Sequence, residues 1–364
     1  MHTEPLQAAR HARERATFGV YVHIPFCAAR CDYCAFATWT DRHHLMASYV
    51  EACVAEVTAA SLPAADTVFF GGGTPSLLPA ELLLSILAAV PRVPAAEVTV
   101  ECNPDTVTPE LMAAYRDGGV NRLSFGAQST VDHVLEGLGR SHRRGALEAA
   151  MTAARAAGFD NVNVDLIMGG PGESADDWRR SLDDVLALEP EHVSAYALTV
   201  EAGTPLALDP ARHPDDDELA DKYLVAEEVL TEAGMASYEI SNWARPGREC
   251  RHNLLYWRQG DYRGIGCAAH SHEAGRRWWN VRTPERYIAA VTAGSSPVAG
   301  EEHLDAATRV LEARQLALRT SDGVPVASLD DVDAIAGLVT VHDGRAVLSP
   351  RGRLLANEVS AHLR

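Results

Sequence analysis

Three cysteines stand close together near the start of the chain, at Cys27, Cys31 and Cys34, with the spacing C-x3-C-x2-C. Thiolates are soft ligands that bind iron–sulfur clusters or zinc. Because a 4Fe-4S cluster ordinarily takes one cysteine for each iron, three thiolates leave one iron open. The amine and carboxylate of a methionyl group can chelate that open iron. The spacing therefore predicts a 4Fe-4S cluster that also binds a small cofactor.

A zinc site is the alternative that the same cysteines leave open. Structural zinc normally takes four Cys or His ligands, and His23 or His43 could supply the fourth. The aromatic residue between the last two cysteines, Tyr33, favours the cluster because its ring can shield the cluster or contact an adenine.

Further polar or glycine-rich residues occur in short segments that each follow a predicted strand directly. These segments are residues 25–27, 71–75, 101–104, 126–129, 165 and 199–201. In parallel barrels, the carboxyl ends of the strands form the mouth that carries the functional site. We therefore expect these separate pieces of sequence to converge on one mouth.

Alternating strands and helices over the first 240 residues would position this chemistry. Short β-branched or aromatic runs predict strands at 19–24, 67–70, 97–101, 121–125, 161–167 and 192–196, with a weaker run at 236–240. Helical spacing predicts helices at 44–59, 79–90, 109–117, 145–157, 175–188 and 216–233. Repeated strand–helix units predict an α/β protein with a parallel sheet. Six units are too few for a closed eight-stranded barrel, so we expect a partial (β/α)6 TIM-like barrel.

The predicted order of domains is a flexible segment over residues 1–16, a core domain over 17–241, a connecting segment over 242–304 and a C-terminal domain over 305–364. The connecting segment is rich in Trp, Tyr and His. The last part combines a helical stretch from about residue 305, a hairpin that turns at Asp343 and Gly344, and a final helix over 350–363. This combination predicts a small α+β domain of the winged-helix-like kind.

Composition and charge disfavour several classes of protein. The chain carries 32 basic and 50 acidic side chains, and its net charge of −18 disfavours binding to nucleic acid. No apolar run is long enough to span a bilayer. Seven cysteines in a long chain with no visible secretory signal argue against a disulfide framework and favour a cytoplasmic location.

Two motifs make the sequence similar to a known family. Residues 21–27, Tyr-Val-His-Ile-Pro-Phe-Cys, and residues 71–76, Gly-Gly-Gly-Thr-Pro-Ser, resemble the oxygen-independent coproporphyrinogen III oxidase group of radical S-adenosylmethionine (radical SAM) proteins. Within this group the resemblance is closest to the heme chaperone HemW family, and it covers nearly the whole chain. It implies a core domain of the radical SAM type, a 4Fe-4S cluster on the three cysteines, and S-adenosyl-L-methionine as cofactor.

The resemblance also implies which side chains bind S-adenosyl-L-methionine. They are Tyr21, Gly72, Gly73, Thr74, Glu101, Gln128, Arg140 and Asp165. The chemistry of these residues agrees with that role. A positively charged sulfonium and amine require carboxylates or carbonyls, the cofactor carboxylate requires an Arg, and the ribose requires an amide or carboxylate acceptor.

Two functions from different classes follow from the resemblance. The first is a heme chaperone that binds heme and transfers it to heme-accepting proteins. The second is an enzyme, a radical SAM oxidative decarboxylase of coproporphyrinogen III. Both imply an electron donor for the cluster. The oxidases carry a further Cys two residues past the third cysteine, whereas this chain has Phe36, which favours the chaperone. The chaperones often have an acidic residue where Ala35 stands, so the match departs there.

Residues 252–257, His-Asn-Leu-Leu-Tyr-Trp, match the pattern H-N-x-x-Y-W that the resemblance assigns to the chaperones. A neutral imidazole is a common axial ligand of heme iron, so His252 is the expected heme contact. Tyr256 and Trp257 would then flank the flat macrocycle. Alternative heme ligands in the same region are Cys250, Cys267, His270 and His272. A purely structural role also stays open, because a His–Asn pair can anchor a loop and a Tyr–Trp pair can fill a core.

Overall fold

The computed structural model describes residues 17–140 and 145–364, so the segment 1–16, predicted to be flexible, lies outside the described residues. Six parallel strands form the centre of the main sheet and neighbour one another in chain order. They are β1 (Phe18–Ile24), β2 (Ala65–Gly72), β3 (Arg92–Cys102), β4 (Arg122–Gln128), β5 (Val162–Met168) and β6 (His192–Ala197). All six coincide with predicted strands, so the parallel α/β arrangement is confirmed.

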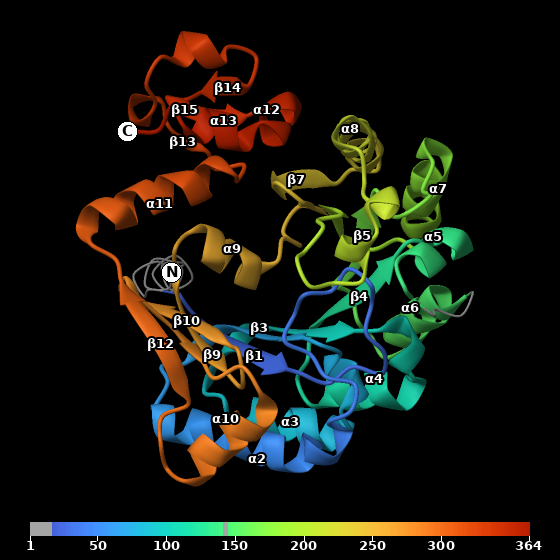
Figure 1. Ribbon diagram of the computed structural model, residues 1–364, viewed down its shortest axis with the longest axis vertical. Helices are drawn as coiled ribbons and strands as arrows, with labels where there is room; N and C mark the ends of the chain where they lie inside the picture. The colour runs from blue at the N-terminus through green and yellow to red at the C-terminus, as the bar shows by residue number, and fades with distance from the viewer. Residues whose placement is uncertain (1–16, 141–144) are drawn as a thin grey trace, which may run out of the picture.

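Helices connect these strands and cover the outer face of the sheet (Figure 1). They are α2 (Met46–Ala60), α3 (Ala80–Ala89), α4 (Pro109–Asp117), the short α5 (Asp132–Gly137), α6 (Ala146–Ala156), α7 (Ala175–Leu186) and α8 (Asp216–Glu232). Local signals fix where they begin: the side chain of Thr108 accepts from Leu111 N before α4, and Ser174 forms a capping box with Asp177 before α7. The six longer helices confirm the helical prediction.

The two faces of the sheet differ in chemistry because successive side chains of a strand point to opposite faces. Val20, Val68 and Val98 are register neighbours on three adjacent strands and belong to the hydrophobic core that the helices share. Alternate positions carry buried polar residues, including Thr67, Glu97, Thr99, Arg122, Ser124, Asn163 and His192. The inner face is therefore polar and leads toward the carboxyl ends of the strands.

Further strands extend both edges of the sheet to twelve strands. At the β6 edge lie the antiparallel β7 (Ala236–Glu239) and β8 (Asn242–Ala244). At the other edge, β9 (Asp261–Ile265) pairs in parallel with β1, followed by the antiparallel β10 (His270–Glu273), β11 (Arg276–Asn280) and β12 (Val298–His303). Helices α9 (Arg251–Trp257) and α10 (Pro284–Thr292) lie between these strands along the chain. Segment 242–304, expected from the sequence only to connect two domains, therefore supplies five strands of the main sheet.

The C-terminal part forms a separate small unit at one end of the molecule (Figure 1). It contains α11 (Ala306–Leu318), a three-stranded antiparallel sheet of β13 (Val324–Pro325), β14 (Val339–His342) and β15 (Arg345–Leu348), and α12 (Pro350–Leu354) and α13 (Ala356–Ser360). The hairpin turns at Asp343 and Gly344, both at positive φ, as predicted. The prediction of one final helix is wrong, because the chain bends at Leu355 and then buries Ala356 and Val359 in the core of this unit.

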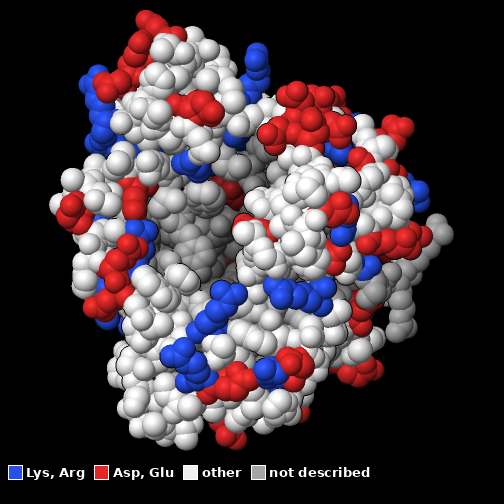
Figure 2. Space-filling model, viewed as in Figure 1, with Lys and Arg blue, Asp and Glu red and all other residues white. Residues whose placement is uncertain are grey.

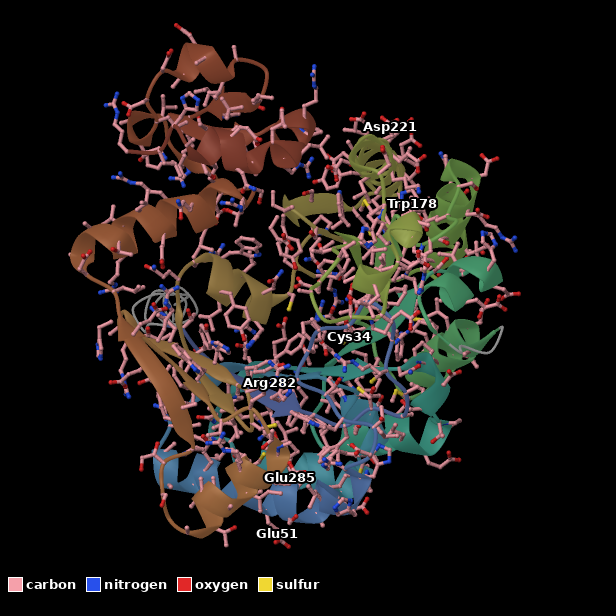
Figure 3. The ribbon with its side chains drawn as sticks, viewed as in Figure 1. Cys34, Glu51, Trp178, Asp221, Arg282 and Glu285 are labelled. Carbon is pink, nitrogen blue, oxygen red and sulfur yellow. The ribbon has the colours of Figure 1, made fainter. Side chains whose placement is uncertain are left out.

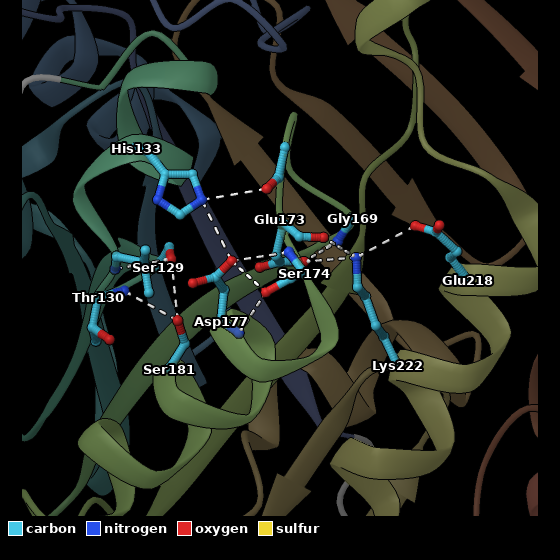
Figure 4. Close-up of polar contacts among 12 residues, drawn as sticks. Ser129, Thr130, His133, Gly169, Glu173, Ser174, Asp177, Ser181, Glu218 and Lys222 are labelled. Carbon is cyan, nitrogen blue, oxygen red and sulfur yellow. Dashed lines mark hydrogen bonds and ion pairs between the residues drawn. The ribbon is translucent and has the colours of Figure 1, made fainter.

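A polar cluster clamps α7 and α8 to the end of β5 (Figure 4). Lys222, the single lysine of the chain, donates to Glu173 O at 2.8 Å and lies 3.4 Å from its Oε2, while Gly169 N donates to the same carboxylate. Both charged side chains are buried, so the pair holds these elements together rather than facing a ligand. Acidic side chains gather over the outer face of α8 (Figure 2). Within the described residues, no helix is long and apolar enough to cross a membrane.

Candidate functional site

The loop after β1 carries the three cysteines and is closed at its base by backbone hydrogen bonds. Trp39 N donates to Pro25 O at 2.8 Å, and Cys27 N donates to Trp39 O at 3.1 Å. Phe26 anchors the start of the loop, since it is fully buried and packs edge-on against Tyr49. The loop therefore leaves the sheet and returns to it at a fixed place.

The three cysteines line one cavity of about 570 Å³ at the carboxyl ends of the strands, and Cys34 is labelled near the middle of the view in Figure 3. All three are partly exposed, whereas the remaining four cysteines are buried: Cys53, Cys102, Cys250 and Cys267. Burial raises the pKa of the Cys27 thiol, and the nearby Thr74 hydroxyl, 3.7 Å from its Sγ, acts to lower it. Three accessible soft donors on one cavity fit an iron–sulfur cluster.

The two histidines that could complete a zinc site both have hydrogen-bond partners in the structure. His23 Nε2 lies 2.9 Å from Ala37 O and its Nδ1 lies 3.2 Å from the Tyr21 hydroxyl, and His43 Nε2 lies 2.9 Å from Cys27 O. Among residues 17–140 and 145–364, no three or more Cys, His, Asp or Glu side chains are grouped to hold a single metal ion. A 4Fe-4S cluster, by contrast, takes each thiolate on a different iron, so its ligands stand apart.

The glycine-rich turn after β2 packs directly against the cysteine loop. Gly73 N donates to Ile24 O and Thr74 N donates to Phe26 O, both at 2.8 Å. A Cβ atom at Gly73 would lie 2.7 Å from Phe26 O and 3.1 Å from Cys27 Sγ, which only glycine avoids. Gly72 has φ +107°, a conformation that other residues rarely adopt. The turn therefore needs glycine in order to hold the cysteine loop in place.

Two carboxylates from β3 and β5 face the same cavity. Glu101 accepts a hydrogen bond from Gly72 N at 3.1 Å. Burial, and then repulsion from Asp165, raise the pKa of Glu101 to about 8. Asp165 is held by the Ser124 hydroxyl at 2.9 Å and by Asn163 Nδ2 at 2.8 Å. Two carboxyl groups with different environments therefore line the cavity, and a bound positive charge would lower the pKa of Glu101.

A guanidinium and an amide complete the lining from the β4 side. Arg140 Nη1 lies 3.5 Å from Cys31 Sγ, and its Nη2 donates to Gly126 O. Gln128 ends β4 at φ 71°, where the pairing with β5 shifts register after Gly126. This irregularity ends the regular ladder next to the cavity, at the position where the sequence predicted a ligand-binding segment.

The structure brings together most of the site residues predicted from the sequence. The cavity is lined by Cys27, Cys31, Cys34, Gly72, Gly73, Thr74, Glu101, Gln128, Arg140 and Asp165. Tyr21 is not among the lining residues; its ring stacks on Phe69 with centroids 6.3 Å apart. Sequence reasoning missed Ser124 and Tyr196, which also line the cavity. Two signals could have found them. Ser124 lies two residues before Gly126 and so points to the same face of β4, and Tyr196 is the last residue of a predicted strand.

His252 lies away from this cavity, on α9, where it packs on the inner face of β1 and β2. Both ring nitrogens are engaged: Nδ1 lies 2.8 Å from Thr67 Oγ1 and Nε2 lies 2.7 Å from the Tyr256 hydroxyl. The backbone N of His252 donates to Glu97 Oε1 at 3.1 Å, and the ring stacks on Phe69. Heme ligation by His252 stays a prediction, and in this conformation it would require the ring to release one of these partners.

The alternative heme ligands also have structural contacts. Cys250 is buried with its Sγ 3.7 Å from Glu97 Oε1, and Cys267 Sγ lies 3.6 Å from the Tyr49 hydroxyl. His270 is exposed and stacks on Trp279, while His272 is buried with its Nδ1 3.0 Å from Gly260 O. None of these four residues lines the cavity that holds the cysteines.

Comparison with known proteins identifies the class that this fold and cavity define. Residues 21–185 match the family profile of the Radical SAM superfamily. The solved structure of coproporphyrinogen III oxidase (HemN) from Escherichia coli, described as a radical SAM enzyme, is similar with a TM-score of 0.81 at 23% identity, over 98% of this chain and 92% of that chain. The protein has an α/β radical SAM fold of the HemN-like kind, with a mixed sheet and a small C-terminal antiparallel sheet.

Curated relatives place the chain more narrowly within that class. The heme chaperone HemW of Mycobacterium tuberculosis (strain CDC 1551 / Oshkosh) is 44% identical, over 94% of this chain and 93% of the relative. The heme chaperone HemW of Bacillus subtilis (strain 168) is 32% identical, over 93% of this chain and 97% of the relative. The chain belongs to the HemW family, which confirms the resemblance seen in its sequence motifs.

Proposed function

We propose that this protein is a heme chaperone, which binds heme and transfers it to heme-accepting proteins. The observation that carries the proposal is the end-to-end similarity to relatives that are named heme chaperone HemW. Phe36 supports it, because the oxidases that the sequence resembles carry a cysteine at this position.

We further propose that Cys27, Cys31 and Cys34 hold a 4Fe-4S cluster whose open iron binds S-adenosyl-L-methionine. When reduced, such a cluster supplies the electron that cleaves the sulfonium of this cofactor. The accessible thiols and their shared cavity support the assignment. Cytoplasmic location belongs to the same proposal, because the cluster of free cysteines suits a reducing compartment.

The residues around the thiols are assigned to parts of S-adenosyl-L-methionine by their chemistry. Arg140 would bind its carboxylate, while Glu101 and Asp165 would bind the amine and the ribose hydroxyls. Gly72, Gly73 and Thr74 would present backbone groups to the methionyl end. Gln128 would hydrogen bond to the cofactor, and Tyr21, which stacks on Phe69 outside the lining of the cavity, would act through neighbouring residues.

We also propose that the main sheet forms a partial barrel and that the C-terminal unit is of the winged-helix-like kind. Six parallel strands with outer helices suit a partial (β/α)6 barrel, whose polar inner face leads to the cavity. The small antiparallel sheet, with α11 before it and α12 and α13 after it, suits a winged-helix-like domain. The domain boundaries predicted from the sequence stay predictions.

A direct experiment tests the function. The cluster is reconstituted anaerobically, and heme is then titrated while the Soret band is followed, with the apo-protein run in parallel. We expect saturable heme binding, and transfer of bound heme to an apo-hemoprotein supplied as acceptor. Failure to bind heme, together with consumption of coproporphyrinogen III under the same conditions, would establish the oxidative decarboxylase instead.

The heme contact of His252 is tested separately. A His252→Ala variant that folds and still gives the heme spectrum of the unaltered protein would exclude His252 as the axial ligand. A changed Soret band in His252→Ala, with an unchanged band in a Cys250→Ala control, would assign the ligand to His252.

A further inference from the structure

The mouth of the cysteine cavity carries an apolar rim that the proposed binding of S-adenosyl-L-methionine does not use. We define the rim by the six apolar or aromatic residues that both line the cavity and are exposed: Ala28, Ala29, Ala35, Phe36, Tyr196 and Ala197. Four of them come from the cysteine loop and two from the end of β6. Single exposed apolar residues are ordinary on protein surfaces, whereas a contiguous group at a cavity mouth marks a binding surface.

Phe36 is 67% exposed although the loop that carries it is well anchored. Thr38 N donates to Phe36 O at 2.9 Å, and Cys34 N donates to Cys31 O at 3.3 Å. The loop is also tied to the barrel through Asp32, which pairs with Arg212 at 2.7 Å. The backbone on either side of Phe36 is therefore held in place, while its ring is exposed.

Tyr196 provides a second ring at the end of β6. The cysteine loop follows β1, which is five strands away from β6 in the sheet. It is 43% exposed, while its hydroxyl interacts with Ser194 and Asn242. Burial of this hydroxyl and repulsion from Asp165 raise the pKa of Tyr196, so the group stays neutral. A phenol anchored at its polar end presents its apolar face without a large loss of conformational entropy on binding.

One basic side chain stands among these residues. Arg30 lines the cavity and is exposed, and its Nη2 lies 3.4 Å from Cys34 O. Two exposed acidic residues, Asp105 and Glu201, also line the cavity, so Arg30 is where a carboxylate of a largely apolar ligand would bind. Heme has both properties, since its macrocycle is flat and apolar and its two propionates are negative.

We propose that the rim is the heme seat, in which the macrocycle lies against Phe36 and Tyr196 and a propionate pairs with Arg30. This inference rests on the proposed chaperone function and adds the residues that carry it. It places heme directly beside the proposed cluster, and away from His252, which lies on α9 with both ring nitrogens engaged.

The test is a heme titration of the reconstituted full-length protein, normalised to iron content and followed by the Soret band. The variants are Phe36→Ser and Arg30→Glu. The matched controls are Leu208→Ser, which removes an apolar side chain that is 84% exposed outside the cavity, and Arg351→Glu, which reverses an exposed charge on α12. We expect the Kd for heme to rise about tenfold in each rim variant and to stay unchanged in both controls.

A second probe separates the ring contact from the charge contact. With the dimethyl ester of heme, which lacks the propionate charges, Arg30→Glu should have no effect, whereas Phe36→Ser should still weaken binding about tenfold. If both rim variants bind heme with the affinity of the unaltered protein, the rim is not the heme-binding surface, and the proposed chaperone function is unaffected. Absence of heme binding by the unaltered protein would overturn the chaperone function and the rim with it.

Discussion

The carboxylate of Glu101 accepts a hydrogen bond from the backbone N of Gly72 at 3.1 Å, which joins the end of β3 to the glycine-rich turn after β2. The two residues were predicted from different sequence motifs. The glycine-rich turn also contacts the loop of the three cysteines. A single side chain therefore connects the polar wall of the cavity to the element that holds the thiols. The protonation of Glu101 should accordingly affect both ligand binding and stability.

The first prediction concerns the pH dependence of stability. Burial raises the pKa of Glu101 from 4.5 to about 8, so the folded protein retains this proton where the unfolded chain has lost it. The side chain consequently destabilises the fold increasingly as pH rises from 4.5 to about 8. Glu101→Gln, which keeps the hydrogen-bond acceptor, should gain stability relative to the unaltered protein over this interval, by at most about 5 kcal/mol.

Urea unfolding of the apo-protein between pH 5 and pH 9 measures this difference. Glu148→Gln, at an exposed position on α6, is the control and should follow the unaltered protein throughout. A stability difference for Glu101→Gln that does not change with pH would show that the carboxylate titrates normally.

The second prediction concerns the cluster ligands. Anaerobic reconstitution should load about four irons per chain. Replacement of Cys27, Cys31 or Cys34 by Ala should each abolish most of this iron, because each thiolate would hold a different iron. Cys53→Ala, which removes a buried thiol outside the cavity, should retain the full iron content. Iron analysis with absorbance spectroscopy measures both, and full loading of the three variants would contradict the assignment.

The third prediction concerns His252 as a structural residue. Its burial lowers the pKa to about 3, so the ring stays neutral in the folded protein while the unfolded chain gains a proton below pH 6.5. Stability should therefore fall as pH drops from 6.5 toward 3, and His252→Gln should remove this part of the acid sensitivity. At neutral pH, His252→Ala should cost about 2–4 kcal/mol, because it leaves a cavity and unpairs Thr67 and Tyr256.

Denaturant titrations at several pH values test this expectation, with His342→Gln as control because that ring is exposed at the β14 end of the hairpin. Equal acid sensitivity of His252→Gln and the unaltered protein would mean that the ring is already accessible to protons in the folded state.

The fourth prediction concerns the redox properties of the cluster. Arg140 Nη1 lies 3.5 Å from Cys31 Sγ, and a positive charge that donates toward a ligand sulfur stabilises the reduced, more negative cluster. Arg140→Met should therefore shift the midpoint potential of the reconstituted cluster to a more negative value, and Arg140→Lys should shift it less. A spectroscopically monitored redox titration measures the potential. An unchanged potential in Arg140→Met would show that the guanidinium does not act on the cluster.

The sequence predicted the six central strands well because their patterning is local. Strands β1 and β5 carry β-branched residues at alternating positions and are mostly buried, so the local run of residue types indicates a strand. The site followed from the same regularity. Once the strands are placed, the residues directly after them must gather at the mouth of a parallel sheet.

The sequence patterns did not predict the four strands β9 to β12, because these strands are stabilised by contacts between segments that are apart in the sequence. The segments Asp261–Ile265 and His270–Glu273 contain few apolar residues and gain their place by pairing with β1 and with each other. The guanidinium carbons (Cζ) of Arg263 and Arg276 lie over the ring of Trp278 on β11, at 4.9 and 4.5 Å from the ring centroid. The contact of Trp278 with Arg263 joins β11 to β9, which are separated along the chain by β10.

The role of His252 was hard to predict for a similar reason. A histidine next to aromatic residues has the chemistry of a heme ligand, but its partners Thr67 and Glu97 come from strands that are more than a hundred residues earlier in the chain. Only the folded arrangement reveals that both ring nitrogens are engaged. The cavity-lining Tyr196 was missed because its exposure depends on where β6 ends relative to the cysteine loop.

The parallel pairing of β1 with β9 has a consequence for how the protein matures in the cell. Residues 18–22 bond on one side to β2, which follows soon after, and on the other side to residues 261–265. Until the ribosome has made residues 261–265, one edge of β1 has no partner strand. The loop with Cys27, Cys31 and Cys34 directly follows this unpaired strand. We therefore expect iron to be delivered to the finished polypeptide and not to the nascent one.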